Sequence, residues 1–82
     1  MKSFSLAIRN PEKSVFFGKV QSLFLRSETG EIGILPDHAP LAATLAPGPI
    51  RYQLESGEKI KIEGGDGFLI VKNNRAVILL KP

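Results

Sequence analysis

The chain has 82 residues, 43% of them hydrophobic, and a net charge of +3 from eleven basic and eight acidic side chains. This length fits a single domain, residues 1–82, with a thin core and modest stability, and the apolar content excludes a disordered chain. There is no cysteine, which excludes disulfides and thiolate metal sites. No apolar run approaches the roughly 20 residues of a membrane span. We therefore expect a soluble domain that does not insert directly into a membrane.

Apolar and polar residues alternate with period two along most of the chain, as they do in half-buried strands. Residues 4–8 predict a first strand, and Pro11 places a turn after it. The segment 15–26 carries apolar residues on both parities. This predicts either a central strand with a bulge near Gly18 or two strands that meet at a bend.

Shorter alternating segments follow at residues 32–34, 41–45, 50–55, 58–63, 68–72 and 75–80. Turn residues separate them: the runs 56–57 and 64–67 predict turns, and Asn73-Asn74 predicts a tight hairpin, since asparagine tolerates positive φ. Many short strands without a helical period are typical of a sandwich or barrel. The sequence therefore predicts an all-β fold, with the phenylalanines supplying much of the core.

Candidate catalytic groups are few. His38 is the only histidine, which excludes a histidine-cluster metal site. It has three interpretations: a loop residue held by backbone hydrogen bonds, a contact at a protein interface, or a general base. Asp37 and Asp66 both fall in turns, where aspartate commonly bonds to its own backbone. We expect no catalytic residue, no metal and no cofactor.

Other binding motifs are incomplete. The run GGDG at 64–67 lacks the Lys-Ser/Thr and the helix of a phosphate-binding loop, so we expect a hairpin turn there. Acidic and basic residues are interspersed, and we see no aromatic residues interleaved with basic ones as in single-strand binders. Lys59 and Lys72 lie near turns but lack the flanking residues of a lipoyl or biotinyl carrier domain. We therefore expect no nucleic-acid partner.

The stretch GEIGILPDHAPLAATLAPGPIRY, residues 30–52, resembles the signature of the epsilon subunit of F-type ATP synthases, in its N-terminal β-sandwich domain. The positions that match are Gly30, Gly33, Pro36, His38, Ala39, Pro40, Leu41, Gly48, Ile50 and Arg51. The pattern F-x-G-x-V at 16–20, the Gly64-Gly65 pair and Asn73-Asn74 with the strand after it are also similar. Together these motifs cover nearly the whole chain.

The resemblance implies a flattened sandwich of about ten short strands and a non-catalytic rotor subunit. With subunit gamma it would form the central stalk, which couples proton or sodium translocation to ATP synthesis. The implied contacts with the polar loops of the c-ring are Glu28, Thr29, Gly30, Glu31 and Ile32. The implied contacts with gamma are His38, Ala39, Pro40, Leu41, Ala42 and Ala43. The alpha and beta subunits would be reached indirectly, at the cytoplasmic face of a bacterial plasma membrane or, as a second interpretation, on the stromal side of a thylakoid.

Two alternatives accompany the resemblance. The family's C-terminal helical hairpin does not follow Pro82, so the chain fits either a naturally short form or a truncated one. We accordingly expect neither inhibition of hydrolysis nor ATP binding. The competing class is a stand-alone all-β module, such as an OB-like nucleic-acid binder, for which salt-dependent binding of oligonucleotides would be the sign.

Overall fold

The structure is a computed structural model that describes residues 2–82, and it confirms the all-β sandwich. It has eight strands where about ten were expected. They are β1 (Phe4–Arg9), β2 (Ser14–Ser27), β3 (Gly30–Ile34), β4 (Leu41–Leu45), β5 (Gly48–Leu54), β6 (Lys59–Gly64), β7 (Gly67–Lys72) and β8 (Arg75–Leu80).

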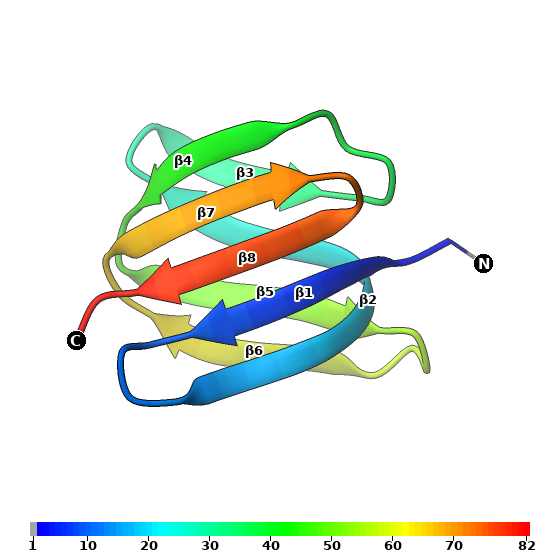
Figure 1. The fold of residues 1–82 in the computed structure, drawn as a ribbon, viewed down its shortest axis with the longest axis horizontal. Coiled ribbons are helices and arrows are strands. Elements are labelled where there is room, and N and C mark those ends of the chain that lie inside the picture. Colours follow the sequence, from blue (N-terminus) through cyan, green and yellow to red (C-terminus); the bar gives the residue numbers. More distant parts are fainter. Residues whose placement is uncertain (1) are drawn as a thin grey trace.

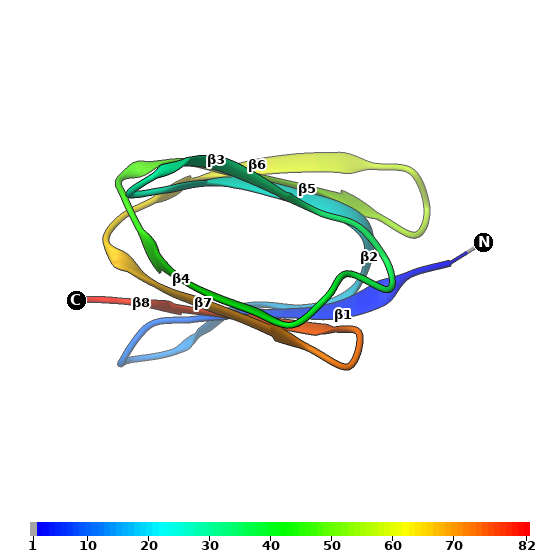
Figure 2. The same ribbon diagram turned by 90° about the horizontal axis from the view of Figure 1, so that it is seen from above.

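The strands form two layers, which Figure 2 shows from the side. One layer contains β4, β7, β8, β1 and the first half of β2, and it lies in front in Figure 1. The other contains β3, the second half of β2, β5 and β6. Neighbouring strands are antiparallel except β1 and β8, which run parallel. The apolar side chains of both layers meet in the space between them.

Strand β2 belongs to both layers, and this explains its mixed apolar pattern. Its first half pairs with β1 and its second half with β3 and β5. The register shifts between Val20 and Ser22, not near Gly18 as the sequence suggested. One residue is added there, so the inward side chains change parity from Val20 to Leu23. The prediction of a bulged strand was therefore right in kind and wrong in position.

The core lies between the layers and is mostly aliphatic. Its buried members are Phe4, Leu6, Ile8, Val20, Leu23, Leu25, Ile34, Leu45, Ile50, Tyr52, Leu69, Val71, Ala76 and Ile78. Phe16 packs against this core, with its ring centroid 4.6 Å from that of Tyr52. The expectation that the phenylalanines supply much of the core was wrong, because Phe17, Phe24 and Phe68 point outward.

The turns follow their sequences with one exception. Asn73 and Asn74 have φ of 52° and 58° and form the expected tight hairpin between β7 and β8. The turn before β6 also closes a hairpin, with β5. The run 64–67 does not, since β6 pairs with β5 whereas β7 pairs with β4 and β8. It carries the chain from one layer to the other.

Candidate partner-binding surface

The predicted ring contacts lie in the hairpin that joins β2 to β3. A buried hydroxyl organises this turn: Ser27 Oγ donates to the carbonyl of Gly30 at 2.7 Å and accepts from the amide of Thr29 at 3.2 Å. Gly30 has a φ of 132°, a conformation that other residues rarely adopt. Glu28 and Thr29 are exposed at the tip. The sequence offered no sign of the role of Ser27, because a buried serine at the end of a strand has no distinctive pattern.

Glu31, one of the implied ring contacts, lies within β3. It pairs across the ladder with Arg26, and its Oε2 lies 3.1 Å from Nη2 of Arg51 on β5. Both charged side chains are about half exposed. Within residues 2–82 the only other ion pair joins Lys2 to Asp37. The carboxylate of Glu28 is therefore available to a partner, while that of Glu31 already has one.

The predicted gamma contacts begin in the loop between β3 and β4. His38 is half-buried, and its amide donates to the carbonyl of Leu35 at 3.2 Å. Its Nδ1 lies 2.7 Å from the carbonyl oxygen of Ala39. Both contacts are to backbone within the loop, which fits the first interpretation of this histidine. Ala42 points outward from β4, whereas Leu41 and Ala43 lean toward the core.

A side-chain clamp holds this loop against the β7–β8 hairpin. Asp37 has a φ of 64°, its amide donates to Oδ1 of Asn74 at 2.6 Å, and Asn74 Nδ2 donates to Asp37 Oδ1 at 2.9 Å. Lys2 Nζ donates to the other carboxylate oxygen at 2.8 Å. The hydrogen bond from Lys2, followed by that from Asn74, lowers the pKa of Asp37. Asp37 was expected to bond to its own backbone; it bonds instead to distant side chains.

One hollow brings the two predicted contact sets together. It has a volume of about 590 Å³ and lies between the β2–β3 hairpin and β4. Its lining residues are Ser27, Glu28, Thr29, Glu31, Ile32, His38, Leu41, Ala42, Ala43 and Thr44. Gly30, Ala39 and Pro40 are outside the lining. The loop and the hairpin, predicted separately, thus form one continuous surface.

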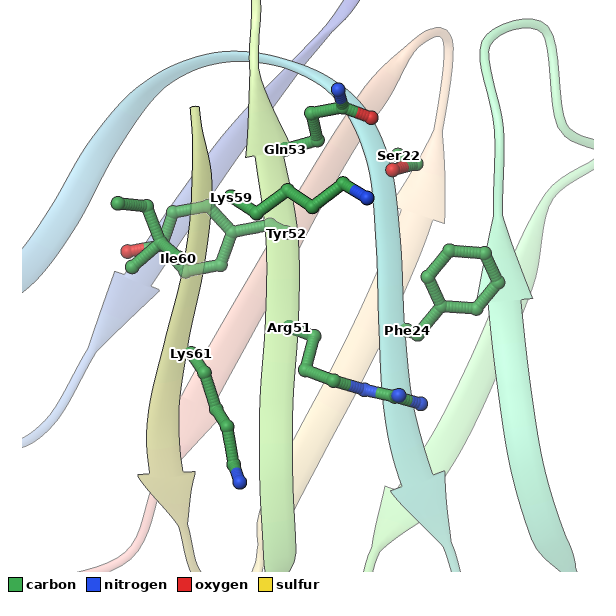
Figure 3. Close-up of a pocket in the computed structure, with 8 residues that line it drawn as sticks. All are labelled: Ser22, Phe24, Arg51, Tyr52, Gln53, Lys59, Ile60 and Lys61. Atoms are coloured by element: carbon green, nitrogen blue, oxygen red, sulfur yellow. The ribbon is translucent and has the colours of Figure 1, made fainter. Parts of the chain in front are cut away.

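A second, smaller hollow of about 350 Å³ lies over β2, β5 and β6, as Figure 3 shows. The guanidinium of Arg51 lies 5.9 Å from the ring centroid of Phe24, and the amines of Lys59 and Lys61 project from β6 beside it. The sequence predicted no series of aromatic residues interleaved with basic ones, and the structure places the single partly exposed ring of Phe24 beside these three basic residues. The grouping needs the pairing of separate strands, and nothing in the linear order reveals it.

The described residues provide little for chemistry. No group of three or more histidine, cysteine, aspartate or glutamate residues within 2–82 could hold a metal ion. Burial raises the pKa of the Tyr52 hydroxyl, and its side chain packs between the layers on Phe16.

Residues 2–82 also include no helix long and apolar enough to cross a membrane. Fold and surface together define a small β-sandwich with two open hollows, one over β2, β5 and β6 and one between the β2–β3 hairpin and β4.

The sequence identifies the family. Residues 3–81 match the family described as the beta-sandwich domain of the ATP synthase Delta/Epsilon chain, and the chain belongs to it. The ATP synthase epsilon chain of Desulforamulus reducens is 41% identical over 78 residues, which are 95% of this chain and 58% of that protein. That of Acinetobacter baylyi is 42% identical over 79 residues, 96% of this chain and 57% of that protein. The chain thus spans somewhat more than half the length of these relatives.

Solved structures show the same fold. A chain in the mitochondrial ATP synthase of Euglena gracilis, described as OSCP/F1/c-ring, superposes with a TM-score of 0.89 at 24% identity. The match covers 95% of this chain and 50% of the other. A chain from the central stalk and c-ring of the Tetrahymena thermophila enzyme gives 0.80 at 15% identity, covering 95% and 63%. These likenesses concern the sandwich alone.

Proposed function

We propose that this chain is a non-catalytic central-stalk subunit of an F-type ATP synthase. In this role it binds subunit gamma and the c-ring and couples ion translocation to ATP synthesis. Family membership and the names of the relatives support the complex. The observation that carries the assignment is the hollow in which the hairpin of the ring contacts meets the strand of the gamma contacts.

The ring contact is assigned to the β2–β3 hairpin, at Glu28, Thr29, Gly30, Glu31 and Ile32. Glu28 supplies a carboxylate for a basic group on a polar loop of the ring, because it has no ion-pair partner within residues 2–82. The bonds of Ser27 hold the turn in one conformation before a partner arrives. Such preorganisation reduces the entropy lost on binding.

The gamma contact is assigned to His38, Ala39, Pro40, Leu41, Ala42 and Ala43. Small side chains in this segment let another backbone approach closely, and the clamp between Asp37 and Asn74 fixes the loop that leads into it. The alpha and beta subunits are reached indirectly through gamma. In a bacterium the protein would lie peripherally, on the cytoplasmic face of the plasma membrane.

Co-purification tests this function. Tagged protein is isolated from membranes of its own source, with a Glu28→Lys variant as the matched comparison. Recovery of alpha, beta and gamma with both proteins, together with loss of ATP-driven ion pumping in the variant, is the expected result. Recovery of none of these subunits with the unmodified chain would overturn the assignment. Pumping that is unaffected by the reversal would overturn the ring contact alone.

A further inference from the structure

The first half of β2 is a free edge of the sandwich. Within residues 2–82, the segment 14–19 pairs with β1 and with no other strand. Figure 1 shows it as the lowest strand of the front layer, with β6 as the lowest strand of the layer behind. A strand at the edge of a sheet presents a row of unpaired amides and carbonyls. This side of the sandwich therefore offers backbone hydrogen bonds to an incoming chain.

The hydrogen bonds of β1 show which residues of β2 have unpaired backbone groups. The amide of Ser5 donates to a carbonyl of the β7–β8 hairpin at 3.0 Å, so Ser5 faces β8. Backbone groups alternate in direction along a strand, and Leu6 therefore faces β2, where it pairs with Gly18. The residues on either side of Gly18 are Phe17 and Lys19. Their amides and carbonyls consequently point away from β1, toward solvent.

This edge lacks the protection that the neighbouring edge has. The backbone hydrogen bond that closes the β5–β6 turn sets the alternation on β6, so that Lys59, Lys61 and Glu63 have the outward backbone groups. All three carry exposed charges, which keep an edge from pairing. On β2, Phe17 is uncharged and its side chain is 76% exposed. Lys19 is the one charged residue of the segment 14–19.

The side chains on this edge define what fits opposite them. Aromatic and β-branched residues pair well across strands, and so do opposite charges. An aromatic or β-branched residue therefore suits the position opposite Phe17, and a carboxylate suits the position opposite Lys19. Lys19 has no ion-pair partner within residues 2–82. Glu12 and Lys13, in the turn at the other end of the edge, carry opposite charges.

We infer that the free edge of β2 binds an extended peptide segment of another protein, which joins the front layer as a further strand. The segment has an aromatic or β-branched residue opposite Phe17 and, two positions along, aspartate or glutamate opposite Lys19. Its backbone accepts hydrogen bonds from the amides of these two residues and donates to their carbonyls. The edge lies across the front layer from β4 and its hollow, so this strand site does not depend on the stalk assignment.

Two other occupants fit less well. The backbone groups of a helix are already paired within the helix, so a helix cannot satisfy those of the edge. A second copy could add its own β2 about a two-fold axis. The two β6 edges would then meet, because β6 is the lowest strand behind β2 (Figure 1). Each carries Lys59 and Lys61, and these like charges would repel.

Two synthetic peptides of one sequence test the backbone hydrogen bonds. Both alternate threonine with the side chains specified above, tyrosine for Phe17 and glutamate for Lys19. One is N-methylated at the tyrosine and the glutamate, whose amides face β2, and the other at the threonines between them. Fluorescence anisotropy should show at least tenfold tighter binding of the second peptide. Equal binding would overturn the strand site, because an apolar contact alone does not distinguish the two edges of a peptide.

Variants of the chain test the side chains with the threonine-methylated peptide. Phe17→Lys gives this edge the protection that β6 has, and it should weaken binding at least tenfold. Lys19→Glu should do the same, and a peptide with lysine in place of glutamate should restore binding to it. Lys61→Glu, on the β6 edge, is the control and should leave binding unchanged. Equal loss with Lys61→Glu would place the peptide on β6 and contradict the assignment.

Amide hydrogen exchange locates the peptide on the chain. In the free protein the amides of Phe17 and Lys19 should exchange faster than those of Phe16 and Gly18, which face β1. The peptide should slow exchange at Phe17 and Lys19 at least tenfold. Unchanged exchange at both positions would overturn the strand site. Protection in the free chain that increases with protein concentration would also overturn it, because the occupant would then be a second copy.

Discussion

Two exposed phenylalanines, one on each outer face of the sandwich, are covered by their neighbours to different extents. On the β3–β2–β5–β6 layer, Phe24 lies opposite Gly33 in the ladder and beneath the guanidinium of Arg51. A Cβ on Gly33 would lie 2.8 Å from the Phe24 ring, so the missing side chain makes room for the aromatic. On the other layer, Phe17 faces Ala7 and has no such cover.

This difference separates an aromatic that the domain covers itself from one that it leaves open. Phe24 is 38% exposed, and Phe17 is 76% exposed. The outer face of the layer with Phe24 also carries the acidic residues Glu31 and Glu63 among its basic ones. On the other layer, every charged residue at an outward strand position is basic. An exposed apolar side chain without cover from its own domain indicates a partner more strongly than a covered one does.

The largest effect should come from comparing the two sides of one strand. Ile78 and Leu79 are adjacent on β8; the first is fully buried and the second points outward. Ile78→Ala should lower the free energy of unfolding by about 2–5 kcal/mol because it leaves a cavity. Leu79→Ser should lower it by only about 1 kcal/mol, because Leu79 is 42% exposed and leaves no enclosed cavity. Urea unfolding measures both. Similar losses would show that the outer face contributes to folding as much as the core does.

The next largest effect should come from comparing two exposed phenylalanines, Phe24 and Phe17. Phe24→Ala should cost about 1–2 kcal/mol, since roughly 60% of a side chain worth about 1.5–3 kcal/mol is covered by Gly33 and Arg51. Phe17→Ala should cost about 0.4–0.7 kcal/mol by the same reasoning, because Phe17 is 76% exposed. Thermal unfolding of the two variants checks this. A larger loss at Phe17 would mean that its side chain is covered within the domain after all.

Glu31 and Glu28 differ in whether the domain itself supplies a partner for the carboxylate. Glu31 lies on the β3–β2–β5–β6 layer and pairs with Arg51. Its pair with Arg51 is about half exposed, and such pairs contribute about 0–1 kcal/mol. Glu31→Lys places a third cation beside Arg26 and Arg51, so we expect a loss of up to about 1 kcal/mol, with Glu31→Gln as the control. ATP-driven pumping should fall less than with Glu28→Lys, because Glu28 is the carboxylate without a partner. A larger effect at Glu31 in reconstituted vesicles would reverse the roles of the two residues.

The alternation of apolar residues was sufficient to predict the strands and the common face of Phe4, Leu6 and Ile8, because period two is a local property of a half-buried strand. Residues 68–71 and 76–80 are apolar throughout, so alternation could not say which of them point inward. The signature at 30–52 was sufficient to predict the family. The layer that each strand joins was not predictable in this way. The run at 64–67 has the composition of a hairpin turn, yet it crosses between layers, since the pairing of β7 with β4 and β8 depends on contacts distant in sequence.

The surface was predictable only in part, for the same reason. The two contact sets were named from the signature, but the hollow that unites them appears only when β4 lies beside the β2–β3 hairpin. The free edge of β2 was missed entirely. Phe17 reads as a core residue in the linear sequence, and only the parity change at residues 20–22 of β2 and the ladder pairing with β1 place it outside.

The smallest effect concerns the clamp that links the hollow to the β7–β8 hairpin. Hydrogen bonds from Lys2 and Asn74 lower the pKa of Asp37 in the folded protein. The folded state is therefore stabilised at pH values at which Asp37 is ionised in both the folded and the unfolded chain. This contribution is present above the pKa of the unfolded side chain, about 4, and is lost as the pH falls through the lower folded value. The side chains of Lys2 and Asp37 are both largely exposed to solvent, so we expect only a slight change in thermal midpoint.

Asp37→Asn should therefore lower the midpoint slightly at pH 7 and not at all near pH 2, where the unmodified carboxyl is protonated too. Asn74→Ala is the matched control for the loop: it removes the amide that bonds both the Asp37 backbone and its carboxylate, so its effect should persist at low pH. An NMR titration of the Asp37 carboxyl carbon should give a midpoint below the ordinary value. A midpoint at or above that value would show that the clamp does not form in solution, and the loop bearing His38 would then lack its fixed place beside the β7–β8 hairpin.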